Sequence, residues 1–256
     1  MLEYADVVWD NLTIDYIKKL ESIQLEAVRI ICGATKLTSH DALYRETGIE
    51  PLQNRRLKHK LIQFHKIIHE QTPNYLRDIL PGRINERHAH NTRRSQNIVT
   101  LPFRTTFHSK SFFPSTINSW NNLPSYVKEN PSVQFLKLYL NNEKIVVPSF
   151  YNVGKRICQI YHARLRLKCS SLREHLYNKN LVENPFCNCG QTESVQHYLL
   201  ECRHYIALRQ QYIYHIQNIT VKLLLYGDTA LSEAENADIF KSVQIFIMKS
   251  KRFDPS

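Results

Sequence analysis

A short stretch near residue 190 holds four side chains that can bind a transition metal. Residues 185–202 have the sequence P-F-C-N-C-G-Q-T-E-S-V-Q-H-Y-L-L-E-C, so a Cys-x-Cys pair precedes a His and a further Cys. Three thiolates and one imidazole this close together are a typical donor set of a closed, tetrahedral zinc site. The pattern predicts one structural zinc ion held by Cys187, Cys189, His197 and Cys202.

The residues between these donors suit the same site. Gly190 permits the tight turn that brings two thiolates to one ion. Glu193 and Ser194 fit the first turn of a helix, which would carry His197 and Cys202 inward.

Other interpretations of the cluster are weaker. A redox pair would have the spacing Cys-x-x-Cys, and catalytic zinc normally keeps an open position that a fourth protein ligand would fill. His204 is a lower-ranked alternative ligand to His197 or Cys202. The remaining cysteines lie in apolar or basic helical stretches and are interpreted as core or incidental thiols: Cys32, Cys158 and Cys169.

The overall charge favours a polyanionic partner. Lys and Arg outnumber Asp and Glu by 34 to 23, which attracts nucleic acid, although a positive excess can also serve solubility alone. With only six glycines and no glycine-rich phosphate loop, nucleotide-binding folds lose their main support. The sequence has no apolar run of membrane-spanning length and no signal-peptide pattern at its start, so we expect an intracellular protein without a membrane partner.

Apolar residues at helical spacing predict a mainly α fold. The first helix is expected from a Thr13 cap to Gly33, the second from about Leu52 to Glu70, and a short one over 132–140. The core-facing residues of the first helix are expected to be Ile14, Ile17, Leu20, Ile23, Ala27, Ile30 and Ile31. Those of the second are expected to be Leu57, Leu61, Phe64, Ile67 and Ile68.

The other face of the second helix is strongly basic. It could lie along a phosphate backbone, or it could be a solvated face. The expected phosphate contacts are Arg55, Arg56, Lys58 and Lys60. His59, His65 and His69 on this helix are the only residues that could support a hydrolase interpretation. Histidines on a basic helix more often face solvent or phosphate.

A long irregular basic loop is expected at about 82–125, where the apolar period is lost. Its Arg93 and Arg94 are candidate contacts to nucleic acid. Large aromatic residues at its end, such as Trp120, could stack on bases, but anchoring the segment to a core is the favoured use.

We expect the chain to divide into a helical half over 1–140, a linker over 141–155, a zinc-stabilised helical module over 156–226, and a tail over 227–256. The module should begin with one or two short helices. It offers a second group of expected phosphate contacts, Arg164, Arg166 and Lys168. The tail is acidic and then apolar, as expected for a docking helix.

Several short sequence segments occur together in the first half of the chain. They are Leu2-Glu3-Tyr4 with Trp9, Leu20-Glu21-Ser22-Ile23-Gln24, Ser111-Phe112-Phe113-Pro114 and Trp120-Asn121-Asn122-Leu123-Pro124. In this order they resemble the region that follows the reverse transcriptase domain in non-LTR (LINE-type) retrotransposons of animals. The segment from Cys187 to Cys202, with Arg164-Leu165-Arg166-Leu167 before it and Arg209 after it, is similar to the zinc-knuckle-like tail of those polyproteins.

The resemblance implies a thumb-like first half and a zinc-bearing tail that hold RNA or DNA, while a separate palm supplies aspartates for nucleotide addition. Here Tyr4-Ala5-Asp6 is followed by Val7, and no Asp-Asp pair occurs anywhere in the sequence. We therefore expect a non-catalytic fragment without a small-molecule substrate, whose partners are RNA or DNA and the catalytic part of a reverse transcriptase. The alternative is a protein-interaction module, or an inert retroelement relic, that folds around zinc without specific nucleic-acid binding.

Overall fold

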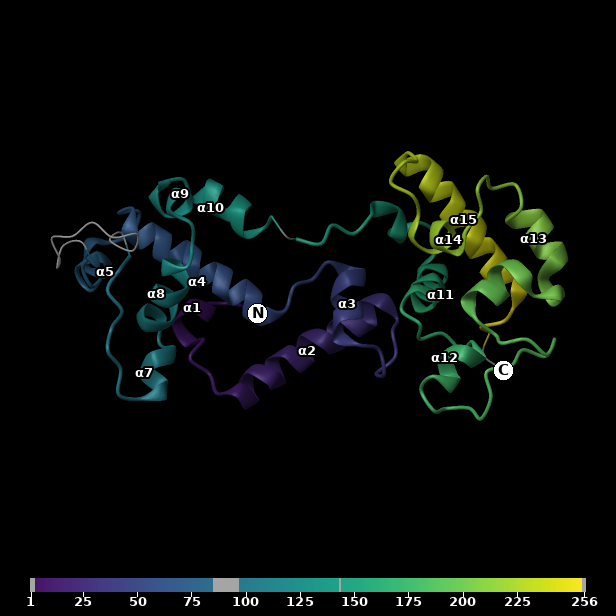
Figure 1. Ribbon diagram of the computed structural model, residues 1–256, viewed down its shortest axis with the longest axis horizontal. Coiled ribbons are helices and arrows are strands. Elements are labelled where there is room, and N and C mark those ends of the chain that lie inside the picture. The colour runs from purple at the N-terminus through teal and green to yellow at the C-terminus, as the bar shows by residue number, and fades with distance from the viewer. Residues whose placement is uncertain (1–2, 85–96, 143, 255–256) are drawn as a thin grey trace. The chain divides into compact units, whose positions relative to one another are not determined.

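The computed structural model describes residues 3–84, 97–142 and 144–254, and its regular elements are helices (Figure 1). Within these ranges the only β-type pairings are two isolated antiparallel bridges, Arg83 with Ile98 and Phe186 with Thr192. The prediction of a mainly α fold is confirmed.

The chain forms two compact units. Unit 1 comprises Met1–Gln24 and Glu50–Lys144, and unit 2 comprises Leu25–Ile49 and Ile145–Ser256. This division differs from the one expected from the sequence, because residues 25–49 belong with the second half and the C-terminal tail is part of unit 2.

Unit 1 is a helical unit with one hydrophobic core. Its helices are α1 (Asp6–Trp9), the first part of α2 (Ile14–Cys32), α4 (Leu52–Ile68), α5 (Asn74–Asp78), α7 (Thr106–Lys110), α8 (Phe112–Asn121), α9 (Ser125–Glu129) and α10 (Val133–Leu140).

Helix α4 supplies one wall of this core. It begins after Pro51, whose fixed φ suits a helix start, and it matches the predicted second helix. Phe64 is fully buried and meets Trp120 of α8 edge to face, with the ring centroids 5.4 Å apart. Leu61 and Phe64 are core residues as expected, whereas Leu57 is 40% exposed and lies outside the core.

Part of the expected irregular loop is helical. Residues 106–121 form α7 and α8, so the prediction of a loop over 82–125 is wrong there. Pro114 lies in the first turn of α8, where its missing N–H removes no intrahelical hydrogen bond, so it does not break the helix. Residues 85–96, including Arg93 and Arg94, lie outside the described residues.

Helix α2 has the predicted length but not the predicted buried face. Of the residues expected in the core, Ile14, Ile23 and Ile30 are more than half exposed. The buried residues lie on another side of the helix: Gln24, Leu25, Val28 and Cys32. Isoleucines follow α2 on more than one side, so apolar spacing alone did not identify the face that packs.

Unit 2 contains the remaining helices. They are the end of α2, α3 (His40–Thr47), η1 (Ser149–Asn152), α11 (Arg156–Arg166), α12 (Arg173–Tyr177), η2 (His197–Glu201), η3 (Arg203–Tyr205), α13 (Ile206–Tyr212), α14 (Val221–Tyr226) and α15 (Glu233–Ser250).

Helix α15 docks on the core of unit 2, as expected for the C-terminal tail. Ser232 and Glu235 form a reciprocal capping box at its start, which satisfies backbone N–H groups that the helix cannot pair itself. Phe240, Val243 and Phe246 are fully buried on its inner side. The helix therefore supplies much of the apolar surface against which the rest of unit 2 packs.

We predict that Phe64→Ala destabilises unit 1 by about 3–5 kcal/mol, because the truncation leaves a cavity between α4 and α8. Leu57→Ala on the same helix removes an exposed side chain and should change the free energy of unfolding by less than about 1 kcal/mol. Urea denaturation of both variants measures the difference. Equal effects would place the core of unit 1 elsewhere.

Candidate metal centre

The four predicted zinc ligands converge in unit 2. Their potential ligand atoms all lie within 4.8 Å of one another. The Sγ atoms of Cys187 and Cys202 are 3.8 Å apart, and Cys189 Sγ lies 3.1 Å from His197 Nε2. Zinc–sulfur bonds of about 2.3 Å at tetrahedral angles would place two sulfurs about 3.8 Å apart, so the cluster can hold a metal ion such as zinc.

A tight turn presents the first two thiols. Cys187 N–H donates to the carbonyl of Gln191 at 2.7 Å, and Gly190 N–H donates to the carbonyl of Cys187 at 2.8 Å. Gly190 has φ = 94°, and a Cβ added there would meet no atom within 4 Å. The turn therefore favours glycine for its backbone conformation and not for lack of space.

A π-helical turn presents the other two ligands. In an α-helix, residues five apart point about 140° away from each other, so His197 and Cys202 would not face one ion. Instead, Cys202 N–H donates to the carbonyl of His197 at 2.7 Å, and the wider turn brings both side chains to the same side. Ser194 Oγ accepts from His197 N–H at 3.0 Å and fixes the start of the turn. The sequence predicted a helix here but not its π-helical geometry.

The protein environment shifts the thiol pKa values of Cys202 and Cys189 in opposite directions. Cys202 is fully buried, and burial raises the pKa of its thiol to about 11 because a bare thiolate is poorly solvated there. A hydrogen bond from the backbone of Gln191 lowers the pKa of Cys189. A bound cation would stabilise all three thiolates, so metal binding and thiol deprotonation are coupled at this site.

His197 lies beside a carboxylate of the same turn. His197 is 2% exposed, and its Nδ1 lies 4.0 Å from a carboxylate oxygen of Glu201 without a hydrogen bond. Metal binding at Nε2 leaves the proton on Nδ1, facing this carboxylate, an arrangement that orients metal-binding histidines in many proteins.

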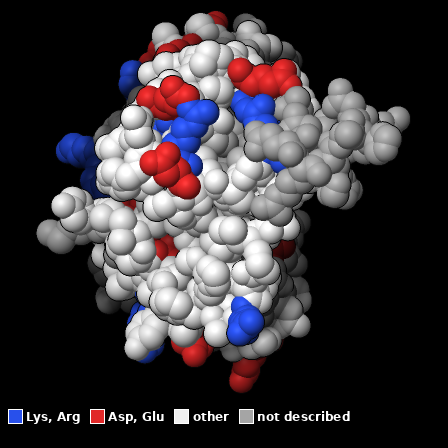
Figure 2. Space-filling view, turned by 90° about the vertical axis from the view of Figure 1, so that its left-hand side faces the viewer, with Lys and Arg blue, Asp and Glu red and all other residues white. Residues whose placement is uncertain are grey.

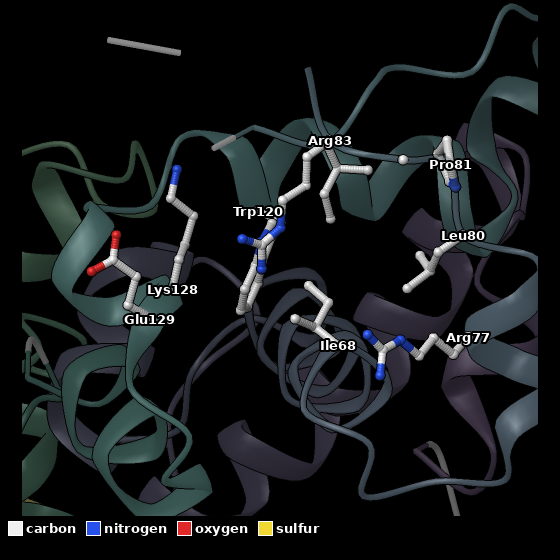
Figure 3. A pocket seen from close by; sticks show the side chains of 10 residues that line it. Ile68, Arg77, Leu80, Pro81, Arg83, Trp120, Lys128 and Glu129 are labelled. Atoms are coloured by element: carbon white, nitrogen blue, oxygen red, sulfur yellow. The ribbon is translucent and has the colours of Figure 1, made fainter. Parts of the chain in front are cut away.

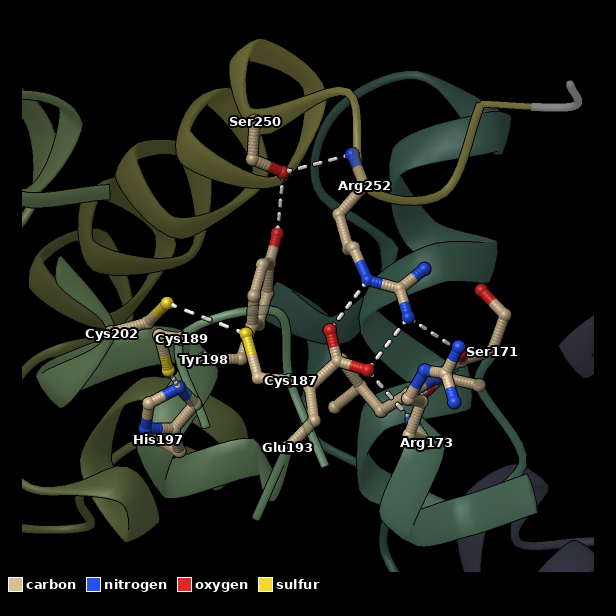
Figure 4. Close-up of polar contacts among 12 residues, drawn as sticks. Ser171, Arg173, Cys187, Cys189, Glu193, His197, Tyr198, Cys202, Ser250 and Arg252 are labelled. Atoms are coloured by element: carbon tan, nitrogen blue, oxygen red, sulfur yellow. Dashed lines mark hydrogen bonds and ion pairs between the residues drawn. The ribbon is translucent and has the colours of Figure 1, made fainter. Parts of the chain in front are cut away.

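The cluster is fastened to the core next to it (Figure 4). Tyr198 directly follows the histidine ligand, is fully buried and shares a hydrogen bond of 2.7 Å with Ser250 Oγ at the end of α15. Glu193 accepts two hydrogen bonds from the guanidinium of Arg252, at 2.6 and 2.7 Å, and a third from the backbone of Arg173 at 2.8 Å. The sequence suggested Glu193 beside the cluster, but its partner Arg252 was missed because it is distant along the chain.

The other cysteines and the alternative ligand lie outside the cluster. His204 is exposed and is not among the converging donors. Cys32 and Cys169 are buried as expected, and burial raises the pKa of Cys32 to about 12, so it is an unreactive thiol at neutral pH. Among the described residues, no other group of three or more Cys, His, Asp or Glu side chains could hold a metal.

The basic residues expected on α4 are engaged within unit 1. Arg56 and Lys60 are buried, and both pair with Asp10, at 3.3 and 2.7 Å. Lys58 pairs with Glu50 at 2.7 Å, and Arg55 Nε pairs with Glu3 at 3.0 Å. The expected phosphate contacts Arg56 and Lys60 therefore do not lie on an open basic face, because both side chains are buried and share one carboxylate that is distant in the sequence.

One face of the molecule shows several such pairs. On the face shown in Figure 2, some Lys and Arg side chains lie next to Asp and Glu side chains and others stand apart from them, and the described residues form no continuous basic band there.

Two of the three basic residues expected on α11 also have structural partners, here within unit 2. Arg164 Nε donates to the carbonyl of Gly33 at 2.6 Å, just past the end of α2. Arg166 is buried and pairs with Glu46 of α3 through both carboxylate oxygens. Its predicted phosphate contact is wrong for this reason, and only Lys168 of this group is exposed.

The histidines of α4 and the aromatic residues of α8 have structural roles. His65 and His69 contact the backbone carbonyls of Asn130 and Lys128, at 2.8 and 3.1 Å, which gives no support to a hydrolase site. Trp120 is 2% exposed and anchors the core, as expected. It borders a cavity of about 220 Å³, where Lys128 Nζ donates to the side chain of Asn97 at 3.0 Å (Figure 3).

Comparison of this chain with protein-family models, with curated proteins and with solved structures found no match. None of the helices in the described ranges is long and apolar enough to cross a membrane.

We predict that the purified chain binds one zinc ion, and that Cys189→Ser lowers the zinc content well below one ion per chain because three ligands hold the metal less tightly. Cys158→Ser removes a thiol outside the cluster and should retain the metal. Native mass spectrometry after dialysis against a weak chelator measures both. Equal zinc in the two variants would contradict the assignment.

Proposed function

We propose that this chain is a non-catalytic nucleic-acid-binding protein whose second unit is held together by structural zinc. The observation that carries the proposal is the convergence of four protein donors in one cluster, because a fully ligated ion has no open position for a reacting water or substrate. The ion then stabilises a fold instead of performing a reaction. No polymerase or nuclease chemistry is assigned to this chain.

The proposed ligand is RNA or DNA, bound through its phosphate backbone. The excess of basic residues supports this partner, and the resemblance to the region after the reverse transcriptase domain of non-LTR retrotransposons favours the same class. With the α4 cations paired internally, the contacts are expected to come from exposed cations such as Lys168 and from Arg93 and Arg94. The catalytic part of a reverse transcriptase is proposed as the protein partner.

A protein-interaction module is the second candidate. The exposed isoleucines of α2 favour it, because unpaired apolar side chains on a helix are typical of surfaces that bind another protein. This candidate needs zinc only as a structural element.

We predict that binding to a single-stranded oligonucleotide weakens steeply with salt. If about four phosphates are contacted, the logarithm of the association constant should fall with a slope of about −3 against the logarithm of salt concentration. Fluorescence anisotropy on the zinc-loaded protein gives this slope. Affinity independent of salt, or no binding at low salt, would contradict the proposal and favour the protein-interaction candidate.

A further inference from the structure

One pocket of unit 2 has a cationic lining that includes none of the four cluster residues. The pocket has a volume of about 680 Å³ and lies between α3, the end of α11, α12 and α14, and this volume is typical of ligand sites. Its lining includes four basic side chains and one carboxylate: Arg45, Arg166, Lys168, Lys179 and Glu46.

The single carboxylate does not neutralise the pocket. Glu46 is held by Arg166 through Nε–H bonds of 3.0 and 3.1 Å to its two oxygens, so these two residues cancel each other. The cations that remain are Arg45, Lys168 and Lys179, which come from three different elements. Lys168 and Arg45 are exposed at the pocket rim, where they can reach an incoming ligand.

Lys179 is the most informative of these residues. Its Nζ is buried and has no hydrogen-bond partner among the described residues. A buried ammonium group without an acceptor is unfavourable, so such a group normally has an anion nearby. None of the described carboxylates pairs with it.

The neighbouring histidine adds no charge to the pocket. Burial and the ammonium groups of Lys179 and Lys168 lower the pKa of His175 to about 4, so the imidazole is neutral at pH 7. Its Nδ1 shares a hydrogen bond of 2.7 Å with Ser170 Oγ, which holds the ring in place.

We infer that this pocket binds a phosphate group, with Lys179 as the inner ligand and Lys168 and Arg45 as the outer ones. A phosphate offers several charged acceptor oxygens that three cations can share, which a single carboxylate cannot match. Tyr226, 44% exposed at the pocket, provides an aromatic surface beside that position. The assignment of the phosphate to a nucleic-acid strand rests on the proposed function, whereas the phosphate affinity itself is independent of it.

The test uses the zinc-loaded full chain with inorganic phosphate as the probe. Phosphate should raise the melting temperature of the wild type above that in chloride at equal ionic strength. Lys179→Met keeps the length of the side chain and removes the buried charge. This variant should melt no lower than the wild type without phosphate, and it should lose the response to phosphate. An equal response in both proteins, or in neither, would overturn the inference.

A labelled single strand distinguishes the source of the phosphate. Lys179→Met should weaken strand binding about tenfold, whereas Lys222→Gln, which removes an exposed charge of the same unit, should change it less than about twofold. If inorganic phosphate displaces the labelled strand from the wild type, the pocket binds a phosphate group of the strand. A phosphate response without competition assigns it to a free phosphorylated ligand.

The same experiment separates this inference from the proposed function. Strand binding that is equally strong in the wild type and in Lys179→Met would leave the proposed function standing and would show that the strand does not use this pocket, whereas the pocket itself is overturned if Lys179→Met keeps the wild-type response to inorganic phosphate. A phosphate response without any strand binding would leave the pocket standing and contradict the proposed function. If Lys179→Met fails to fold, Lys168→Gln at the exposed rim replaces it, and an unchanged response to phosphate in that variant overturns the inference.

Discussion

The geometry of unit 2 depends on bringing three thiols and an imidazole within reach of one ion. Neither of the two segments that supply them is an ordinary element. One is a tight turn with Gly190 at positive φ, and the other is a π-helical turn between His197 and Cys202. Each segment gives up regular backbone geometry, and an ion bound here would offset that loss because metal binding contributes directly to folding free energy.

The cluster also organises the core beside it. Tyr198, next to His197, is hydrogen-bonded to Ser250 at the end of α15. Glu193 accepts a hydrogen bond from Arg252, which follows that helix. Loss of the metal is therefore expected to loosen the contacts of α15 as well as the turn itself. The C-terminal segment, which the sequence analysis set apart as a docking tail, belongs to unit 2.

Much of the positive charge of this protein is used internally. Arg164 satisfies a carbonyl just past the end of α2, and Arg166 pairs with Glu46 of α3. In unit 1, Asp10 pairs with both Arg56 and Lys60. The composition alone therefore overstates the basic surface available to a nucleic acid, and the unpaired cations around Lys179 become more informative than the number of basic residues.

The convergence of Cys187, Cys189, His197 and Cys202 could be predicted because all four lie in one short segment, where spacing and residue type are sufficient. The helices α2, α4 and α10 could be predicted for the same local reason. The buried face of α2 could not, since Ile14 and Ile30 are apolar yet exposed, and packing partners decide which side is covered. The buried ion pairs of Arg56 and Arg166 could not be predicted either, because their carboxylate partners are distant in the sequence.

X-ray absorption spectroscopy at the zinc edge of the purified chain measures the coordination shell of the ion. A closed site of three cysteines and one histidine gives three sulfur neighbours at about 2.3 Å and one nitrogen neighbour at about 2.0 Å, with no bound water. Two or fewer sulfur neighbours, or an oxygen in the first coordination shell, would contradict a closed site formed by Cys187, Cys189, His197 and Cys202.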